Sequence, residues 1–290
     1  MRIALFGRNG QVATAIRQVC APGSLEVIGR DRADFSDPAQ VADAARSVDA
    51  DVFVNAVAYT AVDRAESEPE LAQTVNGTSV GRLAEVAAAR GIPLVHLSTD
   101  YIFDGTGNSP WTPRDAPAPL GVYGASKLAG ERAIATAGAR AVVLRTSWVF
   151  SATGTNFVKT MLRLGAERDR LTVVSDQIGG PTAAHDIADA VLAIAAALHA
   201  GHQGGTFHFA GAPDTSWADF AREIFTQSGT TCEVADIPTS AYPTAAIRPL
   251  NSRLNCSATE AAFGLTRPDW RSSLASVLAE LVERNAHERT

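Results

Sequence analysis

The chain has 290 residues, of which 46% are hydrophobic and 19% charged, and its formal net charge at pH 7 is −6. This length allows one large α/β domain or two smaller ones, and the composition is that of a folded protein rather than a disordered one. The negative charge provides no general attraction for nucleic acid or an anionic membrane, so we expect neither as a partner, and an anionic small molecule would need local arginines and backbone amides.

The first half of the sequence alternates short apolar runs with longer helical patterns. The strand-like runs are 2–7, 25–29, 51–56, 93–99 and 141–150. Apolar residues at three- and four-residue spacings predict helices at 11–20, 38–48, 70–90 and 123–137. Such alternation predicts right-handed crossovers and an α/β fold, with a doubly wound parallel Rossmann sheet in an NAD(P)-binding domain at residues 1–150.

After residue 150 the pattern becomes less regular. Helical segments are predicted at 156–167, 185–200, 216–229 and 271–285, and strands at 171–177 and 205–211. These elements are too intermittent for a second complete sheet. We therefore expect residues 151–290 to form mainly a smaller C-terminal substrate-binding lobe, with some segments returning to the Rossmann domain. The Gly- and Pro-rich stretch 104–121 predicts a long loop that acts as a functional flap.

Cysteine and histidine usage indicates neither a disulfide framework nor a metal site. Cys20, Cys232 and Cys256 lack C-x-x-C spacing, which favours buried, reduced thiols, and the six histidines form no cluster. The first residues run directly into a strand pattern without a signal-peptide core, and the longest apolar helical stretch is interrupted by Asp189. We expect a soluble, cytoplasmic protein.

The first predicted strand ends in a glycine turn, FGRNGQVATAI. Gly7 and Gly10 have G-x-x-G spacing ahead of a helix, so the backbone can approach a pyrophosphate while the helix N-terminus supplies amides and partial positive charge. Ala13 stands where a third glycine is usual and still permits close helix packing. The spacing alone fits an ordinary βα turn equally well, but its position at the first βα junction favours a dinucleotide site.

The end of the second strand concerns the choice of cofactor. NAD-selective sites usually place an acid there for the ribose 2′-hydroxyl, whereas LEVIGRDRADFSD has Arg30. Arginine pairs with a 2′-phosphate, which favours NADPH over NADH, and Arg8 is a second candidate; a solvated surface charge is the alternative. Asp34 and Phe35 fit either an adenine-side contact or the start of the next helix.

Tyr123 and Lys127, in VYGASKLAGERAIA, are four residues apart in a predicted helix and therefore project from one face. A free phenol has a pKa of about 10 and is a poor acid–base catalyst at neutral pH. A neighbouring ammonium, together with an oxidised nicotinamide, is expected to lower that pKa. The spacing thus predicts a carbonyl reductase in which Tyr123 donates the proton as hydride arrives.

A third group should bind the carbonyl oxygen. The fourth strand ends in HLSTDYIF, which places Ser98 and Thr99 at the carboxyl edge where α/β folds bind ligands. We choose Thr99 as the hydrogen-bond donor; alone, it could equally be a strand residue that covers the sheet end.

These features resemble those of the extended short-chain dehydrogenases/reductases, which combine a G-x-x-G turn, Asn-Ala after the third strand, Ser or Thr after the fourth, and Tyr-x-x-x-Lys. Within that family the sequence resembles dTDP-4-dehydrorhamnose reductases along nearly its whole length. The motifs that carry the resemblance are GRNGQV, VNAVAYTAVDRAESEPE, VHLSTDYIFDG, PLGVYGASKLAGE, LRTSWVF, NFVKTMLRL, SDQIGGPT and RPLNSRLN.

The resemblance implies reduction of the C4 ketone of dTDP-4-dehydro-β-L-rhamnose with NADPH or NADH, with Thr99, Tyr123 and Lys127 as catalytic residues. It implies that a larger set lines the cofactor: Gly10, Gln11, Val12, Arg30, Asp34, Phe35, Ala58, Tyr59 and Thr60. Asp100 and Trp148 match positions near the sugar, where an indole gives a hexose an apolar platform.

The segment RPLNSRLN contributes Arg248 and Arg253, two guanidinium groups that suit a nucleotide diphosphate, although an ordinary surface loop has the same composition. Some members of the family use a carboxylate in a Mg²⁺-bridged dimer where this sequence has Ala15, which has no ligand atom. We therefore expect a monomer or homodimer without a metal.

Two alternative functions remain at this point. An epimerase or 4,6-dehydratase would share the cofactor turn and Tyr-x-x-x-Lys, but a dehydratase needs an acid pair where Asp100 is followed by Tyr101. A non-catalytic dinucleotide-binding protein, like the regulatory subunit of methionine adenosyltransferase, is disfavoured by the intact Thr99, Tyr123 and Lys127.

Overall fold

The computed structural model describes residues 1–287 and is built around one parallel six-stranded sheet. The strands are short, and the inner ones are mostly apolar and buried, which is typical of strands covered on both faces. In sheet order they are β10 (Gly205–His208), β5 (Ala141–Thr146), β4 (Leu94–Thr99), β3 (Val52–Asn55), β1 (Ile3–Phe6) and β2 (Leu25–Ile28). The order reverses between β1 and β3, so the crevice in which doubly wound sheets bind ligands lies at the carboxyl ends of these two strands.

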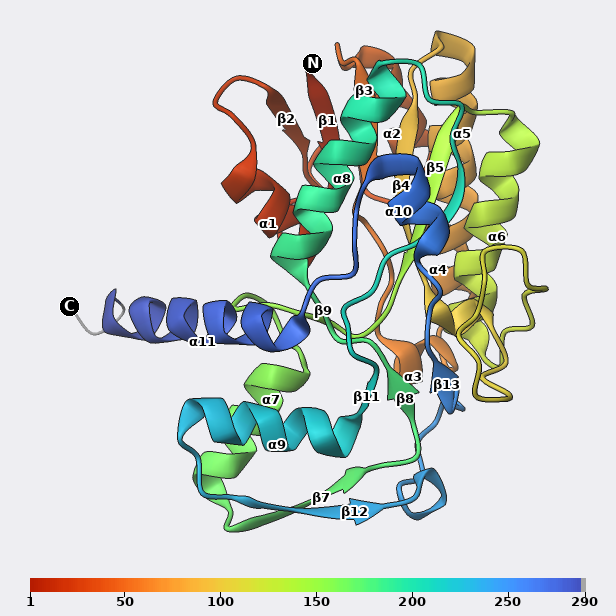
Figure 1. Ribbon diagram of the computed structural model, residues 1–290. Helices are drawn as coiled ribbons and strands as arrows, with labels where there is room; N and C mark the ends of the chain where they lie inside the picture. The colour runs from red at the N-terminus through yellow and green to blue at the C-terminus, as the bar shows by residue number, and fades with distance from the viewer. Residues whose placement is uncertain (288–290) are drawn as a thin grey trace.

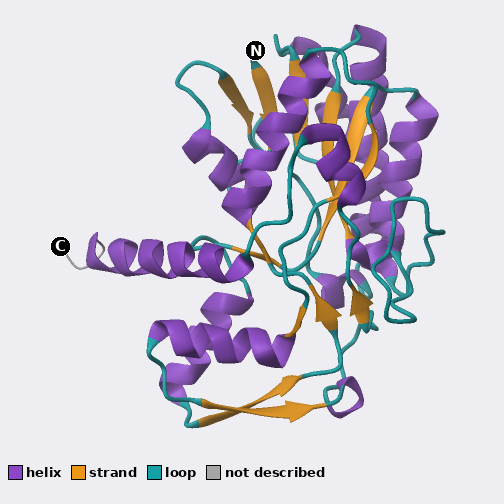
Figure 2. Ribbon diagram, viewed as in Figure 1, coloured by secondary structure: helices purple, strands orange, loops and turns teal. Residues whose placement is uncertain are grey.

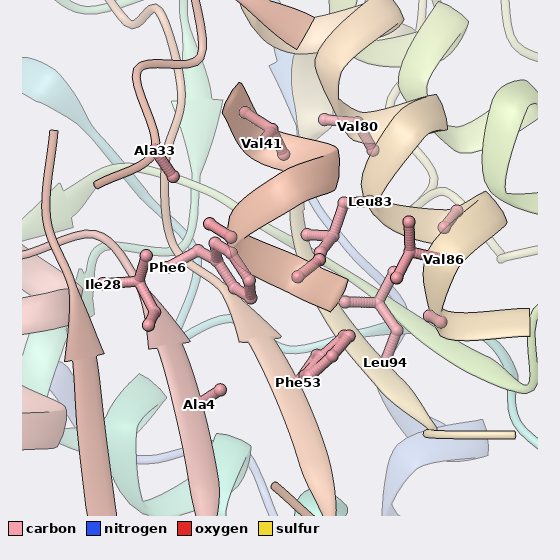
Figure 3. Close-up of a cluster of buried hydrophobic side chains, with 14 of the residues drawn as sticks. Ala4, Phe6, Ile28, Ala33, Val41, Phe53, Val80, Leu83, Val86 and Leu94 are labelled. Carbon is pink, nitrogen blue, oxygen red and sulfur yellow. The ribbon is translucent and has the colours of Figure 1, made fainter. Parts of the chain in front are cut away.

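Helices cover both faces of the sheet (Figure 1). On one face pack α2 (Pro38–Ser47), α5 (Ser79–Arg90) and α6 (Val122–Ala137), and on the other α1 (Gln11–Val19) and α8 (Ala184–His199). Figure 3 shows the core of the first face, where Phe6 and Phe53 meet edge to face at 5.6 Å between ring centroids and Leu83 and Leu94 pack beside them. Although α8 and β10 follow residue 150, both belong to the Rossmann domain: β10 is a strand of the sheet, and α8 packs on its second face.

The helix predicted over 70–90 is continuous in extent but irregular in its middle. It consists of α4 (Pro69–Gln73), a π-helical turn η1 (Thr74–Thr78) and α5. The π turn brings the backbone of Asn76 against α6, where a Cβ at Gly130 would lie only 2.2 Å from the Asn76 carbonyl oxygen. π turns inside helices frequently mark functional sites, and this one lies beside the helix that carries Tyr123.

The strand predicted over 141–150 is interrupted. β5 ends at Thr146 and a separate short strand, β6 (Val149–Phe150), pairs with β9 (Thr182–Ala183). Between them Trp148 has a φ of 49°, a left-handed conformation that is rare for a bulky residue. This turn directs the chain out of the sheet and into the C-terminal lobe.

The C-terminal lobe lies beyond the carboxyl ends of the sheet strands (Figures 1 and 2). Its principal elements are α7 (Phe157–Glu167), β7 (Arg170–Val174), α9 (Trp217–Ser228), β12 (Glu233–Ile237) and α11 (Trp270–His287). Strand β12, which the Pro-rich sequence did not predict, pairs in parallel with β7. The remaining short elements are α3 (Val62–Ala65), η2 (Asp100–Ile102), β8 (Ile178–Gly179), β11 (Thr215–Ser216), η3 (Thr239–Ala241), β13 (Asn251–Ser252) and α10 (Ser257–Phe263).

The lobe has its own apolar core, in which Phe150, Phe220 and Trp270 are buried together. Phe220 meets Phe150 and Trp270 edge to face, at 5.4 and 5.2 Å between ring centroids. Within residues 1–287, no helix has both the length and the apolar character needed to span a membrane.

Candidate active site

Helix α6 brings Tyr123 to the end of strand β4. Glu66 accepts a hydrogen bond from the backbone N–H of Val122 at the first turn of α6, at 2.8 Å. At Gly124 a Cβ would lie 2.1 Å from the carbonyl oxygen of Tyr101, so the helix lies directly on the turn that follows β4. As a result, the rings of Tyr123 and Tyr101 meet edge to face at 5.5 Å between centroids.

The Tyr123 hydroxyl lies where the structure favours the neutral phenol. Burial raises the pKa of Tyr123 to about 12, the negative charge of Asp100 acts in the same direction, and a hydrogen bond with the Thr99 side chain opposes them. In the protein alone the pKa of Tyr123 is therefore raised rather than lowered; the lowering expected with an oxidised nicotinamide beside the phenol stays a prediction. Burial is the largest cause of this shift, and Lys127 is not among its causes.

Lys127 is buried, with 2% of its surface exposed. Its Nζ donates a hydrogen bond to the carbonyl oxygen of Leu97 at 2.7 Å and lies 3.3 Å from Nε2 of the fully buried His96. Burial lowers the pKa of Lys127 to about 8, although the Glu131 carboxylate acts in the opposite direction. At neutral pH Lys127 is therefore closer to its titration midpoint than an exposed lysine is.

Thr99 and Asp100 meet beside the tyrosine. The Thr99 hydroxyl donates to Oδ1 of Asp100 at 3.1 Å and accepts from the backbone N–H of Tyr101 at 3.2 Å. Among the described residues, the buried Oδ2 of Asp100 has no hydrogen-bond partner. Burial raises the pKa of Asp100 to about 6, although hydrogen bonds with the side chains of Ser252 and Thr99 act to lower it. An unpaired buried acceptor of this kind is costly unless something else satisfies it.

A buried ion pair behind these residues was not predicted from the sequence. Glu131, one turn beyond Lys127 on α6, pairs with Arg145 of β5 at 2.6 Å, and the Ser98 hydroxyl donates to Glu131 at 2.5 Å. Ser98 is thus a partner in this network rather than a candidate for the carbonyl oxygen. The only sequence signal was an acidic residue at the i+4 position from Lys127 on the same helix face.

The same network anchors the loop 104–121. Nδ1 of the neutral His208 donates to the Trp111 carbonyl at 3.0 Å, and its Nε2 faces Nη1 of Arg145 at 3.4 Å. Burial, with Arg145 nearby, lowers the pKa of His208 to about 3, which keeps the ring neutral. The Trp111 ring also stacks on Phe103 at 4.7 Å. The loop is thus anchored at Trp111, near its centre, and its role as a flap stays a prediction.

The glycine turn has the form that a pyrophosphate site requires. Gly7 has a φ of 116°, and a Cβ there would lie 3.4 Å from the backbone of Ala56 at the end of β3. The N-cap of α1 is Gly10, whose missing side chain leaves the first amides of the helix uncapped, and Val12 lies half-buried in its first turn. Oε1 of Gln11 accepts hydrogen bonds from Ser151 and Asn156 at 2.8 and 2.9 Å, which joins this turn to the segment before α7.

The end of β2 carries the predicted arginines. Arg30 is largely exposed and pairs with Asp34 at 2.9 Å, and Arg8 pairs with Asp31 at 3.3 Å. A Cβ at Gly29 would lie 2.8 Å from the guanidinium carbon of Arg8, so the absence of a side chain there lets Arg8 fold over the strand end.

The aromatic residue next in the chain, Phe35, is placed differently from these polar groups. Its ring is buried in the core against Phe6, so any contact of this position with an adenine would come from the backbone.

The segment Ala58–Tyr59–Thr60 follows β3 and is half-exposed except for the exposed Thr60. Asn76 of the π turn fixes it, accepting from the Tyr59 N–H at 2.8 Å and donating to the Tyr59 carbonyl at 3.0 Å. The Asn76 amide also donates to Ser126 on α6 at 2.9 Å. One buried side chain thus holds both the predicted cofactor segment and the helix of Tyr123.

A cavity of about 790 Å³ lies in the C-terminal lobe and reaches Tyr101. Its described lining includes Phe157 and Trp217 as apolar walls and Arg168, Arg170 and Arg248 as cations. Trp148, next to the end of β5, stacks on Trp217 with ring centroids 3.6 Å apart. Such a volume is sufficient for a small-molecule ligand with mixed apolar and anionic parts.

The two arginines of RPLNSRLN lie in different surroundings. Arg248 lines the cavity and forms a two-pronged ion pair with Asp63 of α3, at 3.0 and 2.7 Å. Arg253 donates to Oδ1 of Asn251 at 3.0 Å and is absent from the described lining of the cavity.

Comparisons with known proteins agree over nearly the whole chain. The family described as RmlD substrate binding domain matches residues 1–283. A dTDP-4-dehydrorhamnose reductase of Escherichia coli strain K12 is 44% identical over 99% of this chain and 100% of its own length.

Two solved structures of the same enzyme class have this fold. A dTDP-4-dehydrorhamnose reductase of Clostridium acetobutylicum is 34% identical, with a TM-score of 0.90 over 97% of this chain and 99% of its own. That of Bacillus anthracis, solved in complex with NADP, is 31% identical, with a TM-score of 0.89 over 96% and 99% of the two chains.

Proposed function

This chain belongs to the family of dTDP-4-dehydrorhamnose reductases, NADP-dependent oxidoreductases of dTDP-rhamnose synthesis, and we propose that Thr99, Tyr123 and Lys127 carry its reaction. The reaction is reduction of the C4 ketone of dTDP-4-dehydro-β-L-rhamnose to the alcohol of dTDP-β-L-rhamnose. The observation that carries the proposal is the hydrogen bond between the Tyr123 phenol and the Thr99 side chain at the carboxyl end of β4.

Carbonyl reduction needs a hydride at carbon and a proton at oxygen. NADPH, when bound, supplies the hydride. Tyr123 supplies the proton from its neutral phenol. Thr99 holds the substrate carbonyl oxygen by a hydrogen bond and so orients it toward the phenol. After the transfer, Lys127 returns a proton to the phenolate in this proposal, and its pKa of about 8 suits that role.

The residues at the crevice fit NADPH. The uncapped amides after Gly10 suit a pyrophosphate, and Gly7 allows the close backbone approach that this requires. Arg30, which is largely exposed, follows β2, and the half-exposed Arg8 reaches over the end of the same strand, where a ribose 2′-phosphate would lie. On this basis NADPH is the preferred cofactor and NADH the weaker one.

The sugar nucleotide occupies the lobe cavity in this proposal. Asp100 and Trp148 lie near the sugar, and Arg248 meets the diphosphate. Residues 1–150 then bind the dinucleotide and 151–290 mainly the substrate. The half-satisfied carboxyl of Asp100 gains a partner when a sugar hydroxyl donates to its free oxygen.

Replacing Tyr123 by Phe tests the assignment of the proton donor. Phe keeps the ring contact with Tyr101 and removes only the hydroxyl, so Tyr123→Phe should lose turnover by at least a hundredfold, the typical effect of a general acid. Binding of NADPH, followed by its fluorescence, should be unchanged. A variant that keeps full turnover would remove Tyr123 from the mechanism.

A further inference from the structure

The Asp63–Arg248 pair joins two segments 185 positions apart in the sequence. Asp63 lies on α3, three residues after the predicted cofactor segment. Arg248 lies in the loop before β13 and lines the lobe cavity. Asp63 contacts this loop at a second residue as well, because its Oδ1 accepts a hydrogen bond from the backbone N–H of Ala246 at 3.1 Å. The Arg248 side chain is 24% exposed and that of Asp63 45%.

The pair uses only part of the guanidinium. Nη1 of Arg248 donates to Asp63 and to the Ala246 carbonyl, and Nη2 donates once to Asp63. Within the part of the chain that the structure describes, Nε and the second hydrogen of Nη2 have no hydrogen-bond acceptor. These two N–H groups form the side edge of the guanidinium, and an Arg side edge binds a phosphate by two parallel hydrogen bonds.

We propose that Asp63 is a positioning residue for the substrate diphosphate, holding Arg248 by its end so that its side edge is free for a phosphate oxygen pair. This rests on the proposed function, which places a nucleotide diphosphate in the lobe cavity. Holding the arginine in advance reduces the side-chain entropy that binding would otherwise cost. The segment after β3 thus orients a substrate-binding arginine, although Asp63 itself contacts neither the sugar nor the reacting atoms in this proposal.

If Asp63 competed with the substrate phosphate for Arg248, its removal would change substrate affinity in the opposite direction. If the Asp63 carboxylate occupied the place of a phosphate, removing its charge would free Arg248 and strengthen substrate binding. If Asp63 positions Arg248, the same change lets the guanidinium rotate and weakens binding. The direction of the change in affinity therefore separates the two.

The test is Asp63→Asn, which keeps the oxygen that can accept from Ala246 and removes the charge. We expect KM for the dTDP sugar to rise about tenfold, with kcat and the KM for NADPH within about twofold of the wild type, because the lost interaction is made before and during the reaction alike. The affinity for dTDP alone, measured by calorimetry, should fall by the same factor. An unchanged or tighter affinity for dTDP would overturn the proposal.

Two further variants make the result specific. Asp49→Asn removes the carboxylate of another two-pronged Arg–Asp pair, with Arg2 at the amino-terminal edge of the sheet, and should leave every constant unchanged. Arg248→Lys should weaken dTDP binding in the wild type but add little in the Asp63→Asn background, because the two residues act as a unit. Full additivity would contradict the proposal. Since dTDP binding needs no turnover, it also separates failure here from failure of the proposed reaction.

Discussion

Replacing Lys127 by Met should make the stability of the ligand-free protein respond differently to pH. Lys127 is buried and its pKa is lowered from 10.5 to about 8. Between these values the unfolded chain binds more protons at this position than the folded protein. The contribution of Lys127 to the free energy of unfolding is therefore unfavourable at pH 7 and becomes less so as pH rises through 8 toward 10.5.

The magnitude follows from the shift. A lowering of about 2.5 units corresponds to a cost of about 3 kcal/mol when the lysine is fully protonated in the unfolded chain, at about 1.4 kcal/mol per unit. At pH 9.5 most of the folded protein already has the neutral amine, and the remaining cost is about 1.5 kcal/mol. The wild type should thus gain about 2 kcal/mol relative to Lys127→Met between pH 7 and 9.5.

Urea denaturation of both proteins at several pH values measures this difference. Comparing the two proteins cancels the titration of every other group, and comparing pH values cancels the fixed cost of leaving the Leu97 carbonyl without its donor. A difference that stays constant across the range would show that Lys127 has an ordinary pKa, and the proton return that we assign to it would lose its basis.

Two other substitutions test the cofactor and the buried network. Arg30→Ala should raise KM for NADPH about tenfold and leave KM for NADH nearly unchanged, because only NADPH has the 2′-phosphate; steady-state kinetics with each cofactor decides, and equal effects would contradict the assignment. Glu131→Gln should lower the unfolding free energy by about 3 to 5 kcal/mol, because it leaves Arg145 buried without its counter-ion, and Glu131→Gln with Arg145→Met should recover much of it. Denaturant melts measure both variants, and a stable single variant would show that the pair does not matter.

The sheet could be predicted because each of its strands carries a local signal. Apolar runs such as those of β1 and β3 are buried on both faces, and the helices between them repeat at three and four residues. The break at Trp148 could not be predicted, since no local pattern signals its positive φ and the ring on which it stacks, that of Trp217, is almost seventy positions away. Strand β12 was missed because only its pairing with β7 distinguishes it from the Pro-rich segment that follows.

In the candidate site, too, the local features could be predicted and the long-range contacts could not. The Tyr123–Lys127 spacing and the Gly7–Gly10 turn are local and visible in the sequence. The rise in the pKa of Tyr123 in the protein alone was not visible in the sequence, because burial depends on how α6 packs against the turn after β4. The Glu131–Arg145 pair joins a helix to a strand, and so was not visible from residue spacing.

The most direct test of the whole account is to mix the purified protein with NADPH and dTDP-4-dehydro-β-L-rhamnose and follow the absorbance of the reduced nicotinamide. We expect one NADPH to be consumed per keto sugar, with release of oxidised cofactor and dTDP-β-L-rhamnose at each turnover. If the absorbance stays constant while both ligands bind, the chain is not a reductase of this sugar.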